Sequence, residues 1–127
     1  MTHEEIATMI AGIGLPNAYD HFEKEEAVDP PFICFLYPGR SDFYADGTNY
    51  VKITELRIEL YTDNEDFDYE EAVESALESA EIAYSKLGPS YINTERMYVT
   101  TYEMSVRLDP SETTATEEAA TETEVAP

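Results

Sequence analysis

Positive charge is the scarcest property of this sequence. Its 127 residues contain 7 Lys and Arg against 28 Asp and Glu, which gives a formal net charge of −21 at pH 7. Nucleic acids and anionic membrane surfaces are bound largely through basic side chains that neutralise phosphate. The composition therefore excludes unaided binding to either surface, and a DNA-binding function first of all.

Cysteine and long hydrophobic runs are also missing. Cys34 is the single cysteine, so an internal disulfide is excluded, and its place in the apolar run 32–37 predicts a small buried hydrophobe. The N-terminus lacks the basic and apolar regions of a signal peptide, and no window approaches the ~18 apolar residues of a membrane span. We expect a soluble protein that is made in a cytoplasm and has no membrane partner. Its 43% hydrophobic residues suffice for one two-layer core.

Composition changes after Leu108. Residues 109–127 consist mainly of Thr, Glu, Ala and Pro, with six acids, no base and no aromatic residue. Such a segment cannot bury enough apolar surface to offset the entropy of ordering, so we predict a disordered tail. Residues 1–108 then form one domain with 22 acids and 7 bases, a net charge of −15.

The first half of the domain predicts one short helix and a set of extended segments. Thr2 and Glu5 have capping-box spacing and apolar residues follow at helical spacing, which predicts a helix over Thr2–Ala11. The segments that follow are a strand at Phe32–Tyr37, a polar loop at Gly39–Asn49 and an extended stretch at Tyr50–Thr62. The apolar residues of the last stretch change parity, which predicts an irregularity near Thr54 and Glu55.

The second half predicts a long helix followed by strands. Asp68 fits an N-cap with Glu71 three residues later, and Gly88-Pro89 fits the end, so a helix is expected over residues 69–87. Its apolar face, which would cover a sheet, consists of Tyr69, Val73, Ala76, Leu77, Ala80, Ala83, Tyr84 and Leu87. A short strand at 91–92 and a long alternating strand over 98–108 complete the domain. The predicted class is α+β, with a mostly antiparallel sheet of about four strands and the helices on one face.

No catalytic or cofactor motif is present. The sequence has no P-loop, no GxGxxG and no GxSxG, and His3 and His21 lie too far apart in sequence to form a recognisable ligand pair. The acids Asp63, Glu65, Asp66 and Asp68 resemble a calcium loop but lack its central Gly and closing Glu. Paired carboxylates carry no signal in a chain with 28 acids. We expect neither an enzyme nor a metal or cofactor site.

A row of glutamates lies beside the apolar face of the predicted long helix: Glu70, Glu71, Glu74, Glu78 and Glu81. Within this row, glutamates that lie four residues apart are neighbours of like charge. Each such pair costs roughly a few tenths of a kcal/mol, and the row contains no base that would offset the repulsion. It is either an ordinary solvated face or a surface kept negative toward a passing polyanion or a basic partner. Ile82, on the far side of the helix from its core face, would be an exposed aliphatic residue.

Two aromatic residues stand apart from the rest. Most of the 10 Tyr and 5 Phe fit core or sheet positions. Phe43 and Tyr44 instead lie in the polar loop 39–49, next to the turn signal Asp46-Gly47. Aromatic side chains in such loops more often serve as interface anchors than as core. We therefore nominate Arg40, Phe43 and Tyr44 as a partner-docking loop.

Taken together, five stretches of the chain resemble a known family. They are GLPNAYDHF, DPPFICFLYPG, ADGTNYVKITELRIELYTD, DYEEAVESALESAEIAYSKLG and YINTERMYVTTYEMSV. In this order they are similar to the tail terminators, or tail-completion and head-tail joining proteins, of siphophages and prophages of Gram-positive bacteria. The resemblance covers about residues 3–108 and rests on overall pattern, and the acidic tail departs from the family's usual compact ending.

The resemblance implies a structural role in the virion, at the head-tail interface. Tail terminators form a hexameric ring on the last ring of the tail tube, stop tube growth and present the other face to the head-tail connector or stopper. The implied partners are further copies of the chain, the major tail tube protein and the connector, with DNA passing through the channel without specific binding. The family's docking loop would correspond to Gly39–Asn49. A negative channel would repel phosphate, so Glu70, Glu74, Glu78 and Glu81 are a candidate channel-facing stripe.

Two other classes of protein are compatible with the sequence. One is an acidic DNA mimic that inhibits a DNA-binding protein, which needs carboxylates spaced like phosphates on one continuous face. The other is a neighbouring head-tail connector or capsid-completion subunit, which would have a similar size and composition.

Overall fold

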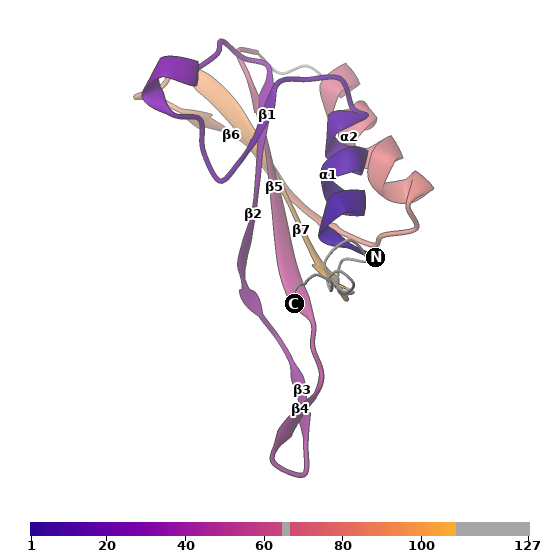
Figure 1. Ribbon diagram of the computed structural model, residues 1–127. Helices are drawn as coiled ribbons and strands as arrows, with labels where there is room; N and C mark the ends of the chain where they lie inside the picture. The colour runs from indigo at the N-terminus through magenta and orange to yellow at the C-terminus, as the bar shows by residue number, and fades with distance from the viewer. Residues whose placement is uncertain (65–66, 109–127) are drawn as a thin grey trace, which may run out of the picture.

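The computed structural model describes residues 1–64 and 67–108. It contains a five-stranded sheet, two helices on one face of that sheet, and a two-stranded arm that extends from one end of it (Figure 1). Along the chain the elements are α1 (His3–Ala11), β1 (Asn17–Tyr19), the 3-10 helix η1 (Lys24–Glu26), β2 (Phe32–Arg40), β3 (Phe43–Ala45), β4 (Thr48–Val51), β5 (Thr54–Thr62), α2 (Phe67–Ser79), β6 (Ser85–Ile92) and β7 (Met97–Val106).

The strand order of the main sheet is β1-β2-β5-β7-β6. β1 runs parallel to β2, and the other neighbours are antiparallel. The α+β class is confirmed, although the main sheet has five strands where about four were expected. β5 and β7 lie at its centre, so the two strands with the cleanest apolar alternation have a neighbour on each side.

The core fills the space between the sheet and the helices. Leu56 and Ile58 of β5 lie opposite Met104 and Tyr102 of β7, on the face that the helices cover. The helices contribute apolar side chains at helical spacing, namely Ile6 and Ile10 from α1 and Val73 and Leu77 from α2, and all four are 0% exposed. The alternation read from the sequence is therefore the alternation of a sheet with one buried face.

The N-terminal helix begins as its sequence predicts. The Thr2 hydroxyl accepts a hydrogen bond from the Glu5 amide at 3.1 Å, and the Glu5 carboxylate accepts one from the Thr2 amide at 2.8 Å. Two amides that the first turn leaves without helical partners are satisfied in this way. The capping box is confirmed, with His3 as the first helical residue.

The second helix ends at Ser79, so the prediction that it reaches Leu87 is wrong. Glu81 adopts a left-handed conformation with φ of 60°. Its amide donates to the Glu78 carbonyl and the Ile82 amide donates to the Leu77 carbonyl, both at 3.0 Å. This pair of bonds is the Schellman motif, which ends helices most often with Gly in the left-handed position. Because Glu81 rather than a glycine occupies the left-handed position, the usual glycine signal for a helix end was found only at Gly88.

Residues expected in the last turns of that helix form the edge strand β6. Leu87 is 55% exposed rather than part of the core face. Ile82, expected to be exposed, packs against the core instead. Gly88 interrupts the pairing of β6 with β7; its φ is 91°, and a Cβ there would lie 2.9 Å from the Val99 carbonyl oxygen. A residue other than glycine would strain this irregularity.

Other expectations from the sequence meet the structure as follows. Cys34 is buried, and burial raises the pKa of its thiol to about 11, as expected of a small core residue. Neither helix in the described part of the chain has the length and hydropathy needed to cross a membrane. The predicted disordered tail, residues 109–127, lies outside the described residues.

Candidate functional site: a projecting hairpin arm

Residues 41–53 form an arm that continues the line of β2 and β5 beyond the main sheet (Figure 1). β3 and β4 pair antiparallel within it, with Ala45 opposite Thr48. The connection is the two-residue turn Asp46-Gly47, whose φ angles are 52° and 76°. Positive φ at both positions is the geometry of a type I′ hairpin turn, which Asp-Gly favours because its twist matches that of the strands. The expected polar loop is therefore an ordered β-hairpin.

The base of the arm is closed by one carboxylate. Asp42 accepts hydrogen bonds from the Asn49 amide group at 2.6 Å and from the Ile53 backbone at 3.1 Å, and it pairs with Arg40 at 2.8 Å. The Ser41 amide also donates to the Ile53 carbonyl at 2.9 Å. The Asn49 bond, with the Ile53 amide and Arg40, holds the pKa of Asp42 below its usual value. These contacts fix the direction in which the arm leaves the sheet.

The two strands of the arm present large aromatic side chains to solvent. Phe43 is 58% exposed, Tyr44 67% and Tyr50 72%. The Phe43 and Tyr50 rings meet edge to face with centroids 6.5 Å apart. Tyr44 follows Phe43 at the point where the pairing of β3 with β4 shifts its register. The arm therefore carries three exposed aromatic residues around an irregular step of its ladder.

The structure divides the three nominated docking residues between two places. Phe43 and Tyr44 belong to β3 and are exposed on the arm, whereas Arg40 ends β2 at the base, paired with Asp42. Sequence reasoning missed Tyr50, because it was assigned to the start of a strand. Asp46-Gly47 was recognised as a turn signal, but not as the centre of a hairpin that includes residues on both sides. The irregularity expected near Thr54 lies at residues 52–53, between β4 and β5.

The glutamates of α2 do not form one solvent-facing stripe, and that expectation is wrong for two of them. Glu70 is 4% exposed, and its carboxylate lies 2.7 Å from the Lys86 ammonium. Glu74 lies 2.8 Å from the same ammonium and also accepts a hydrogen bond from the Tyr102 hydroxyl at 2.8 Å. Lys86 reaches them from β6, so the base missing from the helix is supplied by the neighbouring strand.

Ionisation of Lys86 and Glu74 is shifted toward the charged forms. The hydrogen bonds to Glu70 and then Glu74 raise the pKa of Lys86. Burial pushes the pKa of Glu74 upward, but the hydrogen bonds from Lys86 and Tyr102 outweigh it, and the pKa lies below its usual value. Of the remaining stripe residues, Glu78 accepts a bond from Tyr84 at 3.0 Å, and both Glu78 and Glu81 stay exposed.

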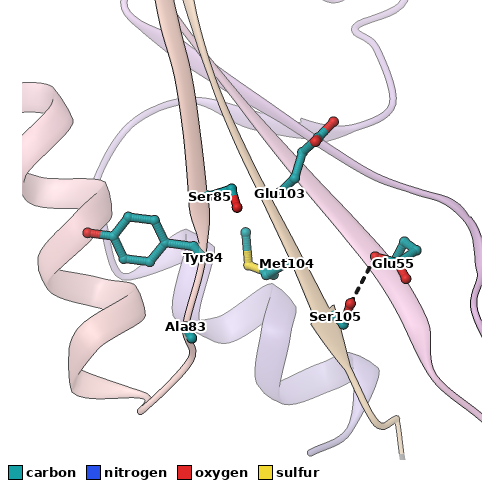
Figure 2. Close-up of a pocket in the computed structure, with 7 residues that line it drawn as sticks. All are labelled: Glu55, Ala83, Tyr84, Ser85, Glu103, Met104 and Ser105. Carbon is teal, nitrogen blue, oxygen red and sulfur yellow. Dashed lines mark hydrogen bonds between the residues drawn. The ribbon is translucent and has the colours of Figure 1, made fainter.

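A cavity of about 510 Å³ lies beside the start of β6 (Figure 2). Its polar lining consists mainly of Glu55, Ser85, Glu103 and Ser105, and the Ser105 hydroxyl donates to Glu55 at 3.0 Å. None of its lining residues is a His, Lys or Cys, the groups that usually activate a serine or act as nucleophile. The described residues contain no group of three His, Cys, Asp or Glu arranged to hold a metal. Glu65 and Asp66 of the calcium-like segment lie outside those residues.

Comparison with known proteins gives no match: no protein-family model matches the chain, and neither does any curated protein.

Proposed function

We propose that this chain is a virion structural protein, a tail terminator that assembles into a hexameric ring on the tail tube, stops its growth and joins the tail to the head-tail connector. The role is structural rather than catalytic. The observation that supports the proposal most is the arm, an ordered hairpin that carries exposed aromatics away from the body of its own subunit.

The arm has the properties of an assembly contact. More than half of each of the three aromatic side chains Phe43, Tyr44 and Tyr50 is exposed. At ~25 cal/mol per Å² and about 150–250 Å² per aromatic side chain, burying them would contribute roughly 10 kcal/mol before the costs of association. The arm therefore exposes enough aromatic surface to stabilise a contact with a partner.

A projecting arm also suits a ring. A contact between an arm on one subunit and a different surface on the next is heterologous, and repetition of such a contact closes into a ring when the rotation allows it. The hydrogen bonds of Asp42 at the base of the arm lower the ordering cost of that contact, because the arm is already folded in the free subunit.

The acidic surface is proposed to keep DNA moving through the ring. A negative channel repels phosphate, whereas a basic one would hold it. Glu70 and Glu74 are engaged by Lys86, so Glu78 and Glu81 are the better candidates from the original stripe. A basic or neutral lumen in an assembled ring would refute this part of the proposal.

The decisive experiment compares two double variants of the full chain in phage assembly. Phe43→Ala with Tyr44→Ala should leave a folded subunit but give unterminated or unjoined tails in electron micrographs. The matched control is Phe67→Ala with Tyr91→Ala, which removes the same residue types from the start of α2 and from β6, outside the arm, where they are 63% and 51% exposed. Normal virions from the arm variant, or equal defects from both variants, would contradict the proposal.

Two outcomes would point to the other candidate classes. Labelled protein found within the connector or capsid rather than at the tube end would indicate a connector or capsid-completion subunit. Recovery of a DNA-binding enzyme with the protein would indicate a DNA mimic. The ion pairs of Glu70 and Glu74 argue against the mimic, because they remove two carboxylates from the row on α2.

A further inference from the structure

A cleft of about 360 Å³ lies on the face of the sheet opposite the helices. Its floor includes Phe32 and Cys34 of β2 and Tyr61 of β5, and one wall is the segment between β1 and β2 with Phe22 and Val28. That segment, which contains η1, lies across the sheet from α1 and α2 (Figure 1). The volume falls within the range of sites that hold a small molecule or a large side chain.

Aromatic rings line the cleft in a continuous row. The Phe22 ring meets the Phe32 ring edge to face at a centroid distance of 5.4 Å, and the Phe32 ring stacks on the Tyr61 ring at 4.8 Å. Aromatic faces attract cations through the negative charge of the ring face, most strongly where water is partly excluded. The row thus offers both an apolar surface for a side-chain stem and a preference for positive charge.

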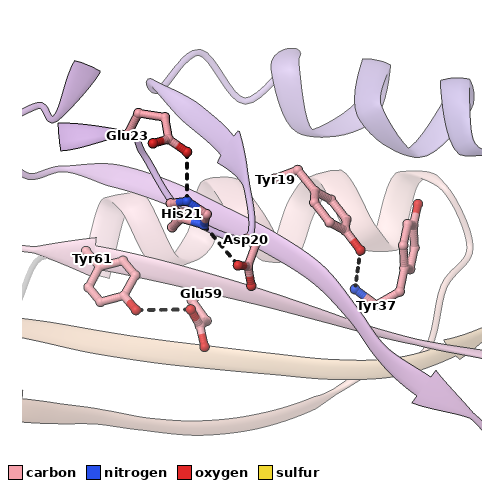
Figure 3. Close-up of polar contacts among 7 residues, drawn as sticks. All are labelled: Tyr19, Asp20, His21, Glu23, Tyr37, Glu59 and Tyr61. Atoms are coloured by element: carbon pink, nitrogen blue, oxygen red, sulfur yellow. Dashed lines mark hydrogen bonds and ion pairs between the residues drawn. The ribbon is translucent and has the colours of Figure 1, made fainter. Parts of the chain in front are cut away.

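Asp20 and Glu95 line the cleft, and Glu59 lies beside the Tyr61 end of the row. Glu59 is the cross-strand neighbour of Cys34 and accepts the Tyr61 hydroxyl at 3.0 Å, and Asp20 lines the cleft (Figure 3). Burial is the main cause of the raised pKa of Cys34, and the negative charges of Glu59 and then Asp20 raise that pKa further. Both charges therefore act on the floor of the cleft. Residues 20–29 contain five acids and one base. The cleft therefore lies in a negative field.

The wall that carries Asp20 is held in place by a histidine. His21 lies 2.9 Å from Asp20 through Nδ1 and 3.0 Å from Glu23 through Nε2 (Figure 3). Asp20 itself has a φ of 67°, a left-handed conformation that Asp and Asn tolerate better than most residues. These contacts shape the wall before any partner arrives.

We propose that this cleft binds an Arg or Lys side chain from a basic segment of a partner protein, with its aliphatic stem over Phe32 and Tyr61 and its charged group toward Asp20 and Glu59. The occupant is a protein of opposite charge rather than a second copy of this chain. Two copies would each bring a domain of net charge −15, and three of the seven bases, Arg40, Arg57 and Lys86, already have carboxylate partners within their own chain. The proposal is independent of the arm and of the function proposed above.

The test uses the full chain and two capped hexapeptides, one of alternating Arg and Leu and one of alternating Glu and Leu. Binding is followed by NMR through the methyl groups of Ile92 and Met97, which line the cleft. The test variant is Asp20→Asn with Glu59→Gln, in which Asn keeps the left-handed backbone accessible. The control is Glu4→Gln with Glu71→Gln, two exposed acids on the helices, which changes net charge by the same amount.

The Arg-Leu peptide should shift both methyl resonances, and the test variant should weaken its binding at least about fivefold more than the control does, because two specific charge contacts are lost. Equal weakening by the two variants would mean attraction to the net charge alone and would overturn the proposal. Equal binding of the Glu-Leu peptide, or resonances of Ile92 and Met97 that do not move, would overturn it as well. None of these readouts involves Phe43 or Tyr44, so failure here leaves the proposed function untouched.

Discussion

Replacing Lys86 with methionine should destabilise the fold more than its position on an exposed edge strand suggests. Methionine keeps most of the length of the side chain but removes the ammonium that pairs with Glu70 at 2.7 Å and Glu74 at 2.8 Å. The Glu70 side chain is 5% exposed. The variant therefore leaves a carboxylate in the interior without its cation.

The size of the effect follows from this burial. Removing one partner of a buried ion pair costs about 3–5 kcal/mol, because the other charge stays buried. Solvent reaches 34% of the Lys86 side chain and screens part of the interaction, so we expect a loss of about 2–3 kcal/mol. For a domain of this size that is roughly 10 °C in Tm.

The assay is thermal and denaturant unfolding of the full chain, beside two further variants. Lys52→Met removes a base from an exposed position near the arm and should change stability by less than about 0.5 kcal/mol. Glu70→Gln in the Lys86→Met background should restore at least about 1 kcal/mol, because it removes the orphaned charge.

The advantage of wild type over Lys86→Met should depend on pH in a defined way. The pKa of Lys86 is raised in the folded protein, so its contribution is complete below the unfolded value of about 10.4 and is lost as the pH rises through the folded value. The pKa of Glu74 is lowered, so its contribution is present above about 4.3 and is lost as the pH falls through the folded value. Equal Tm losses for Lys86→Met and Lys52→Met, or no rescue by Glu70→Gln, would refute the reasoning.

Three further predictions concern the backbone and the arm. Glu81→Gly should raise the free energy of unfolding by about 0.5 kcal/mol in denaturant titration, because relief of the left-handed strain exceeds the added freedom of the unfolded chain; a loss of stability would contradict the Schellman assignment. Gly88→Ala should lower the free energy of unfolding by about 1–3 kcal/mol, because the added Cβ would lie 2.9 Å from the Val99 carbonyl oxygen. An unchanged denaturation midpoint would show that this contact relaxes freely. Asp42→Asn should speed hydrogen exchange at the side-chain amide of Asn49 and the backbone amide of Ile53, with little change in Tm. In wild type the same loss of protection, relative to the intrinsic exchange rate at each pH, should appear only as the pH falls through the lowered pKa of Asp42. Above the ordinary pKa of an aspartate, the carboxylate is charged and its contacts are complete. Slow exchange in the variant would mean that Asp42 does not hold the arm.

Local chemistry sufficed to predict several elements. The capping box at Thr2 and Glu5 and the Asp46-Gly47 turn each depend on residues within a few positions of one another. The alternation in β5 and β7 likewise reports which face is buried, because a shift of one residue would expose the whole apolar set. These signals identified the α+β class, one helix start and the position of the arm's turn.

Other features depended on residues that meet only in the folded chain. A glutamate at the left-handed position ended α2, and the hydrogen bonds of Glu81 and Ile82, rather than residue preference, decided where. Tyr50 became an exposed residue of the arm because β4 pairs back on β3. The cleft beside Cys34 exists because a segment from before β2 folds over the sheet.

By itself, the sequence determined that the chain is strongly acidic, with few bases to offset its carboxylates, because composition is independent of conformation. Which of the carboxylates are exposed and which are paired was decided by the tertiary structure alone. Lys86 lies beyond the end of α2, and the turn at Glu81 brings β6 back along the sheet so that its ammonium meets Glu70 and Glu74. Two members of a row of like charges, Glu70 and Glu74, are compensated in the folded protein, since spacing along one helix says nothing of a cation on the next strand.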